Sequence, residues 1–276
     1  MSKKEKKITI NTKLKFFSIL KDTFRYYFKN IFYIFIINIV FFVIFNSFIA
    51  NHYTAFIGKT FKTGFYIFYY SFIFLLLYPF KIGFFNNIIY NQRSGSTGGF
   101  FESLSFGCKR FFPIMLSIIL FLITSTILSL VVIGVFLFFY YFFSIYLHGF
   151  GDPNDKDGAT LRVLKISTSF LRSFNLVKGN LFRFIFFTFI ISFSVYYFTN
   201  FFLNYIKLNK IYVDEATLQT IIFSFYDFIL IYTIVVFFGL TKIESDIKDE
   251  KYEIEAEERA LMMQQALENK ALARKG

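Results

Sequence analysis

The sequence predicts an all-α polytopic membrane protein with six transmembrane helices, and three observations carry this prediction. The chain has 276 residues, 56% of them hydrophobic, with a mean hydropathy of +0.54, whereas soluble domains are about 45–50% apolar. The apolar residues form runs long enough to cross a bilayer core of about 30 Å, which requires roughly 20 residues. Basic residues gather in alternate segments between these runs, as is typical of loops that stay in the cytoplasm.

Six apolar runs define the predicted spans, which together form a membrane domain over residues 31–240. The apolar stretch from Phe111 to Leu147 is split in two, because one helix of that length would measure about 55 Å. A tight turn near residues 131–134 separates the halves, and Pro113 then falls in a first helical turn, where its missing N–H costs little. The spans cover residues 31–50, 64–80 (ending at Tyr78-Pro79), 113–130, 133–148, 181–203 and 220–240.

The distribution of positive charge sets the predicted orientation. Of the 30 Lys and Arg residues, 26 lie before residue 31, in 81–110, in 149–183 or after residue 241. The other side carries the remaining four, which are Lys59, Lys62, Lys207 and Lys210. Because Lys and Arg concentrate in cytoplasmic loops, we expect a multi-pass protein of the cytoplasmic (inner) membrane with both termini in the cytoplasm.

The net charge of +12 is interpreted in the same way. In a soluble protein such a charge would indicate nucleic acid as a partner. Here the cations flank membrane spans, where they fix the topology and attract anionic lipids. The predicted partner is therefore a lipid bilayer with anionic headgroups, and no nucleic acid is expected.

Amphipathic segments precede the first, third and fifth spans and are predicted to be helices in the membrane interface. Apolar residues recur in them at spacings of three and four, with Lys and Arg on other faces. The first segment belongs to a basic cytoplasmic N-terminus, residues 1–30. The apolar stripes are Phe16, Phe17, Leu20, Phe24, Tyr27 and Phe28; Phe100, Phe101, Leu104, Cys108, Phe111 and Phe112; and Val163, Ile166, Phe170, Phe174 and Val177.

These segments resemble one another in sequence as well as in position. Lys29-Asn30-Ile31-Phe32 parallels Gly179-Asn180-Leu181-Phe182 at the start of the first and fifth spans. We interpret the chain as three repeats, each with an interfacial helix, an outward span and a returning span. The alternative is that basic amphipathic helices share this pattern without being repeats.

The charged tail, residues 241–276, is predicted to be a cytoplasmic helix. Two interpretations stay open for it. The helix either docks a protein partner or pairs with itself, or it is a solvated helix, because small Ala side chains bury little area. Its apolar stripe consists of Ala256, Ala260, Met263, Leu267 and Ala271.

Asp227 is the only acidic residue within a predicted span. An ionisable side chain at membrane depth is costly and is therefore a candidate functional site. It could bind a cation, relay a proton or pair with a positively charged substrate. The alternative is a structural carboxyl group that is hydrogen-bonded inside the bundle, with Asn38, Asn200 or Tyr residues as partners.

No catalytic, cofactor or metal site is predicted, and the chain is not expected to be an enzyme. The single cysteine, Cys108, cannot form a thiolate cluster, and the two histidines, His52 and His148, fall on opposite sides of the predicted membrane. Phosphate-binding glycine loops and common hydrolase motifs are absent from the sequence. The acidic run 152–157 lacks the Gly and Glu that a calcium loop requires, so Asp155 or Asp157 is interpreted as a helix cap.

The segment before the fifth span carries a resemblance to a known family. Ser173-Phe174-Asn175-Leu176-Val177-Lys178-Gly179-Asn180 is similar to a motif of six-helix bacterial membrane proteins that include the membrane region of some glycerophosphodiester phosphodiesterases. Ser173, Lys178, Gly179 and Asn180 are the family-like positions, and the likeness covers about residues 14–240. The turn between the third and fourth predicted spans has only Gly134, where the family often has Pro-Gly. The resemblance implies a fold; phosphodiesterase activity is not implied.

Two functions remain under consideration. The first is a non-enzymatic scaffold or accessory subunit, which the missing catalytic groups, the interfacial helices and the charged tail favour. The second is a carrier or permease for a small or lipidic substrate using Asp227, since repeats that meet near the midplane are common in transporters.

Overall fold

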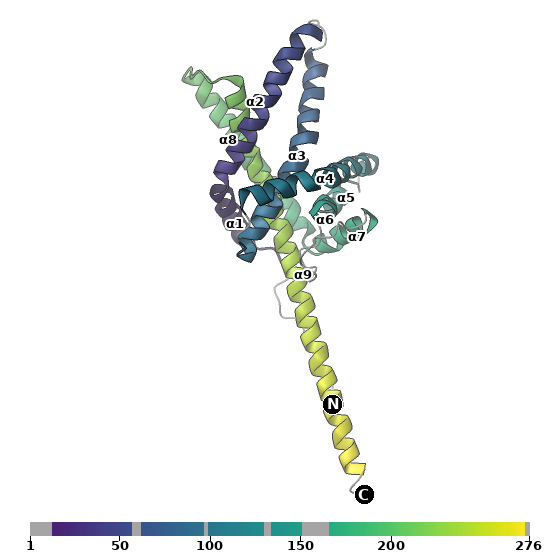
Figure 1. Ribbon diagram of the computed structural model, residues 1–276. Coiled ribbons are helices and arrows are strands. Elements are labelled where there is room, and N and C mark those ends of the chain that lie inside the picture. The colour runs from purple at the N-terminus through teal and green to yellow at the C-terminus, as the bar shows by residue number, and fades with distance from the viewer. Residues whose placement is uncertain (1–12, 57–61, 97–98, 130–133, 151–165, 274–276) are drawn as a thin grey trace.

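The computed structural model describes residues 13–56, 62–96, 99–129, 134–150 and 166–273, and all regular structure within these ranges is α-helical. Figure 1 shows long helices gathered into a bundle, with one helix projecting far beyond the others. The helices are α1 (Phe16–Lys29), α2 (Ile31–Phe56), α3 (Lys62–Ser94), α4 (Phe100–Ser129), α5 (Gly134–Tyr141), α6 (Ser144–Phe150), α7 (Ile166–Val177), α8 (Leu181–Leu208) and α9 (Glu215–Ala273).

Several helices are long and apolar enough to cross a membrane. Among the described residues three qualify alone: Phe100–Ile127, Leu181–Leu208 and Thr217–Ala256. A fourth is obtained if Phe16–Lys29 and Ile31–Val43, which meet at a bend of 59°, are taken together. These lengths and compositions are those of a membrane protein.

Helix α9 is the centre of the bundle. From Leu230 to Phe238 every residue is buried, so this stretch is covered by protein on all of its faces. A helix that is apolar all round is stable only when it is surrounded in this way. Beyond the bundle α9 continues without a break to Ala273 (Figure 1), across the predicted boundary at residue 241.

Helices α3 and α4 approach each other closely where two glycines meet. A Cβ placed on Gly83 would lie 3.0 Å from the Cα of Gly107, and one placed on Gly107 would lie 3.2 Å from the carbonyl oxygen of Phe80. Small residues allow helix backbones to pack this closely in membrane proteins. This close crossing fixes the position of the middle of α3, which includes Phe80 and Lys81.

Three predicted boundaries were wrong. The helix that contains the second predicted span does not end at Tyr78-Pro79, because α3 includes Pro79 and continues to Ser94. Pro113 lies inside α4, so the predicted interfacial segment before the third span and the span itself form one helix. The predicted fourth span is two short helices, α5 and α6, separated at residues 142–143. Proline is tolerated within membrane helices because neighbouring groups satisfy the freed carbonyl.

The other two predicted interfacial segments do form separate helices, α1 and α7, and in each case an asparagine directly precedes the next helix. The backbone N–H of Asn30 donates to Tyr26 (3.1 Å) and its carbonyl accepts from Ile34 (3.0 Å). At the other joint Asn180 donates to Val177 (2.9 Å) and accepts from Phe184 (2.8 Å). The aligned asparagines therefore occupy equivalent positions in the fold.

The side chains of both asparagines connect elements far apart in sequence. Asn30 and Gln92 of α3 form two side-chain hydrogen bonds, of 2.9 and 3.2 Å. The Oδ1 of Asn180 accepts from the backbone N–H of Leu14 at 2.9 Å, and Arg183 donates to the Leu14 carbonyl at 3.0 Å. The two joints thus hold α3 and the start of the chain against the bundle.

We expect Asn30→Ala to lower the free energy of unfolding by about 1–3 kcal/mol, because it leaves polar groups in a buried joint without a partner. Asn209→Ala is a matched control, since Asn209 makes the same bond to a carbonyl four residues earlier (2.8 Å in both) but is exposed. Denaturant unfolding of the detergent-solubilised protein measures the free energy of unfolding of each variant. Equal losses in the two variants would show that the Gln92 contact contributes nothing.

Candidate functional site

Asp227 lies in a buried ion pair with a cation that sequence reasoning had placed in a cytoplasmic loop. The Nζ of Lys81, on α3, is 2.7 Å from each carboxylate oxygen of Asp227, on α9. The side chains are 1% and 4% exposed. The Lys81 ammonium also lies 5.9 Å from the centre of the Phe223 ring. Each charge is therefore compensated within the bundle.

Asn38 completes the site from α2. Its Nδ2 donates to the Oδ2 of Asp227 at 2.9 Å and to the Oγ of Ser224 at 3.0 Å. The Ser224 hydroxyl donates in turn to the carbonyl of Thr220 at 2.7 Å. Asn38 is fully buried, and its predicted role as a partner of Asp227 is confirmed by these contacts.

Tyr27 connects α1 to the same part of α9. Its hydroxyl donates to the backbone carbonyl of Ser224 at 2.9 Å, which a mid-helix carbonyl can accept as a second bond. Polar contacts from α1, α2 and α3 therefore converge on a single turn of α9. We call Asn38, Lys81, Ser224 and Asp227 the polar centre.

A second buried polar contact lies along α9. The hydroxyls of Tyr146, on α6, and Thr233 are 2.6 Å apart, and Thr233 donates to the carbonyl of Leu230 at 2.8 Å. Tyr146 is therefore the donor in the first bond. Thr233 is six residues beyond Asp227, or about 9 Å along the helix. Polar side chains of this kind join helices inside a membrane bundle.

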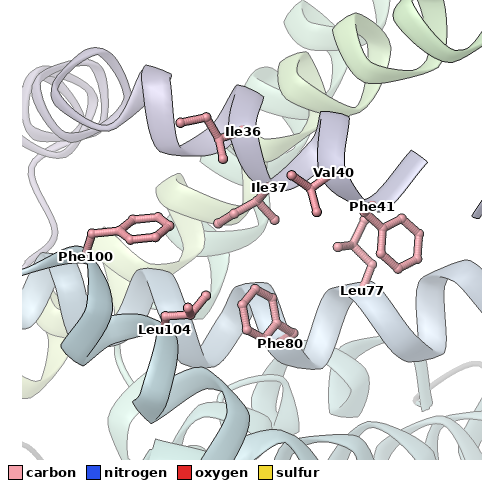
Figure 2. Close-up of a pocket in the computed structure, with 8 residues that line it drawn as sticks. All are labelled: Ile36, Ile37, Val40, Phe41, Leu77, Phe80, Phe100 and Leu104. Atoms are coloured by element: carbon pink, nitrogen blue, oxygen red, sulfur yellow. The ribbon is translucent and has the colours of Figure 1, made fainter. Parts of the chain in front are cut away.

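A cavity lies between helices of which α2 and α3 also contribute residues to the polar centre. The volume of this cavity, which lies between α2, α3 and α4, is about 270 Å³, and its lining is apolar. Figure 2 shows the side chains that line it. It has no side chain that could act as an acid, a base or a nucleophile, and so it favours an apolar occupant. The lining residues are Ile36, Ile37, Val40, Phe41, Leu77, Phe80, Phe100 and Leu104.

The four family-like positions lie at the joint between α7 and α8 and not at the polar centre. The Oγ of Ser173 donates to the carbonyl of Tyr140 at 2.7 Å, which ties α7 to α5. Lys178 is exposed, and Gly179 has φ +88°, a left-handed conformation that glycine adopts without strain after a helix. Asn180 then begins α8. These residues have a structural explanation as a helix-ending motif.

The other residues considered as candidate sites are not part of the polar centre or lie outside the described residues. Asn200 is half-buried on α8, whereas the hydrogen bonds of Asp227 go to Lys81 and Asn38. Cys108 is exposed. Within the described ranges no three His, Cys, Asp or Glu side chains are grouped so that they could hold a metal ion. Asp152, Asp155 and Asp157 lie outside the described residues, as do the side chains of His52 and His148.

The signal that could have revealed Lys81 was its distance from the other cations of its loop. It precedes Arg93 by twelve residues, and none of the residues between them is charged. A cation isolated in this way on the same helix as an apolar run is a candidate partner for a lone intramembrane acid.

Comparison with known proteins adds no family assignment. No protein-family model matches the chain, and neither the curated proteins nor the solved structures include one that does.

Proposed function

We propose that this chain is a six-span protein of the cytoplasmic membrane that serves as a non-enzymatic scaffold or accessory subunit. The proposed spans are α2, α3, α4, the pair α5 and α6, α8, and the first part of α9, with α1 and α7 in the interface. The resemblance to the six-helix bacterial family belongs to the same proposal, and so do the cytoplasmic positions of both ends.

The charge distribution is consistent with this topology after one revision. Lys81 leaves the cytoplasmic group because it is buried against Asp227, so 25 cations face four across the proposed membrane. The polar contacts of α2 lie at two depths of the proposed membrane, and at each depth the partner is a polar side chain. Asn30 contacts Gln92 at the cytoplasmic end of α2, and Asn38 contacts Asp227 about 12 Å deeper, eight residues along the helix.

The observation that carries the proposal is the continuity of α9. Its 59 residues correspond to about 90 Å of helix. One part is the buried centre of the bundle, and the other projects clear of it (Figure 1). A helix anchored in this way presents its far end at a fixed distance and direction from the membrane. We call residues 248–273 the arm.

The arm has the surface of a docking helix. Tyr252 and Met263 are 68% and 69% exposed, and 11 residues separate them, which places them on the same face at 100° per residue. Ala256 lies between them on that face and is also exposed. Ion pairs between residues four apart, such as Lys251 with Glu255 (3.8 Å), favour the helix in solvent.

The base of the arm is attached to the bundle by an ion pair. Arg172 of α7 contacts Glu244 of α9, and both are partly buried. Any truncation that removes Glu244 would disturb α7 as well as the arm. A stop after Lys248 retains the pair and is therefore the cleaner way to remove the arm.

We expect in-cell crosslinking and purification of the full chain to recover a stoichiometric protein partner, and the chain ending at Lys248 to lose it. The expected cause is loss of the Tyr252 and Met263 face, so Tyr252→Lys with Met263→Lys in the full chain should have the same effect. Partner yield per mole of chain, by quantitative mass spectrometry, is the readout. Recovery of the chain alone from wild-type cells contradicts the scaffold proposal.

The polar centre favours a second candidate, a carrier that uses Asp227. A carrier would break the Lys81 pair during its cycle and pass the carboxylate to a proton or a cationic substrate. Lys81→Met with Asp227→Leu removes both charges together and keeps the bundle without an unpaired ion. Normal abundance with failed growth would favour the carrier, whereas normal abundance with normal growth would remove the reason for proposing one.

A further inference from the structure

A lateral groove opens between the first two helices and the last two, and its lining is almost entirely apolar. Its volume is about 470 Å³, within the usual range of about 300–1,000 Å³ for small-molecule sites. Phe24, Phe28 and Phe35 line one side, and Val195, Phe198 and Phe225 line the other. The lining belongs to α1 and α2 on one side and to α8 and α9 on the other.

The groove extends from α1, the proposed interfacial helix, to at least the middle of the proposed membrane. Phe24 and Phe28 belong to α1, which the proposed topology puts at the cytoplasmic side. Val195 lies 14 residues beyond Leu181, the first residue of α8, or about 21 Å along the helix. One leaflet of a bilayer has a hydrocarbon depth of about 15 Å. The groove is therefore at least as deep as one leaflet, so an acyl chain of the inner leaflet would fit along it.

Positively charged side chains lie beside the aromatic residues of α1 that line the groove. Phe24 and Phe28 are 45% and 59% exposed, and exposed Lys21 and Arg25 lie one turn away on the same helix. Lys29 is exposed at the end of α1, and Asp22 is the only acidic residue in that helix. Basic residues beside apolar side chains at this level attract anionic lipid headgroups.

We propose that the groove is a binding site for an anionic phospholipid of the cytoplasmic leaflet. The acyl chain lies between Phe35 and Phe198, and the headgroup phosphate contacts Lys21 and Arg25. A partner helix would fill the apolar part of the groove but would not require the neighbouring cations. The proposal rests on the proposed topology, but it is independent of the arm and of any protein partner.

The test uses the absence of tryptophan from the chain. Phe35→Trp places a single tryptophan in the groove, and Phe189→Trp places one at a residue of α8 that is 68% exposed. Each variant is reconstituted in phosphatidylcholine vesicles that contain a minor fraction of brominated phosphatidylglycerol or, separately, brominated phosphatidylcholine. Bromine on an acyl chain quenches tryptophan on contact, so quenching reports which lipid occupies the site.

We expect the Phe35→Trp probe to be quenched more strongly by the anionic brominated lipid, and the Phe189→Trp probe equally by both. Lys21→Gln and Arg25→Gln should each weaken the preference, by roughly five-fold per cation. Equal quenching of the groove probe by the two lipids would overturn the proposal. So would a groove probe that neither lipid quenches while Phe189→Trp is quenched, because protein would then cover the groove.

A second measurement needs no substitution in the groove. Native mass spectrometry of the wild-type chain, released from vesicles of equal phosphatidylglycerol and phosphatidylcholine, should retain phosphatidylglycerol preferentially. The Lys21→Gln and Arg25→Gln chain should lose that preference. Retention of both lipids in proportion to their abundance would also contradict the proposal, whether or not the tryptophan variants fold.

Discussion

Lys81→Met is expected to lower the free energy of unfolding by about 3–5 kcal/mol, because it leaves Asp227 as an uncompensated buried charge. The two side chains are nearly inaccessible, and the ammonium is 2.7 Å from both carboxylate oxygens. Water therefore cannot replace the lost partner. Thermal unfolding of the detergent-solubilised protein, with recovery of monodisperse material, measures the change.

Two controls distinguish the loss of the ion pair from the loss of side-chain packing as the cause of the lower stability. Adding Asp227→Leu to Lys81→Met removes the second charge and should restore most of the stability, since a buried ion pair can often be replaced by apolar residues. Lys207→Met removes an exposed cation and should change stability by no more than about 0.5 kcal/mol. A double variant that is less stable than Lys81→Met alone would contradict this account of the pair.

Gly83→Leu is expected to be the second most damaging change. Its Cβ would lie 3.0 Å from the backbone of Gly107 and 3.3 Å from the Cδ1 of Ile114, and the remaining atoms of leucine have no space between the helices. Overpacking of a core typically costs about 1–3 kcal/mol and sometimes more. We expect α3 and α4 to separate, with loss of the folded fraction on gel filtration.

Gly99→Leu is the matched control for that substitution. A Cβ on Gly99 would meet nothing within 4 Å, and the residue comes directly before α4. The two variants add the same side chain, one between α3 and α4 and the other at a position where an added Cβ meets no atom within 4 Å. Similar folded fractions for both would show that the close approach of the helices is not required.

Much of the helical architecture could be predicted from hydropathy alone. Long apolar runs have no other stable arrangement in lipid than helices, so the helical class follows from composition. The separate helices α1 and α7 were also predictable, since their apolar residues follow a helical period. Asp227 was identified for the same kind of reason, because a lone acid in an apolar helix is rare.

The boundaries that failed depend on tertiary contacts. The sequence after Pro79 is interrupted by Lys81 and by polar residues such as Asn86 and Asn87, so the span seemed to end there. In the structure these three side chains are buried. Lys81 is paired with Asp227, and Asn87 donates to Ser103 at 3.2 Å. Hydropathy averages along the chain and does not register a partner 146 residues away.

The repeated asparagines show what a weak alignment can and cannot reveal. Asn30 and Asn180 were aligned on four residues each, and both begin a long helix after a shorter one. Their side-chain partners differ, however, since one contacts Gln92 and the other the backbone of Leu14. The local geometry follows from the local sequence, whereas the partners follow from the packing of the whole bundle.

Site-specific photocrosslinking in living cells tests the central claim that the arm docks a protein. A photoreactive amino acid replaces Tyr252 on the arm, or Phe189 on the exposed surface of α8 as a control. The account predicts one discrete protein adduct at position 252, absent at position 189 and lost when Met263 is changed to Lys. The same products at both positions, or no protein adduct at position 252, would contradict it.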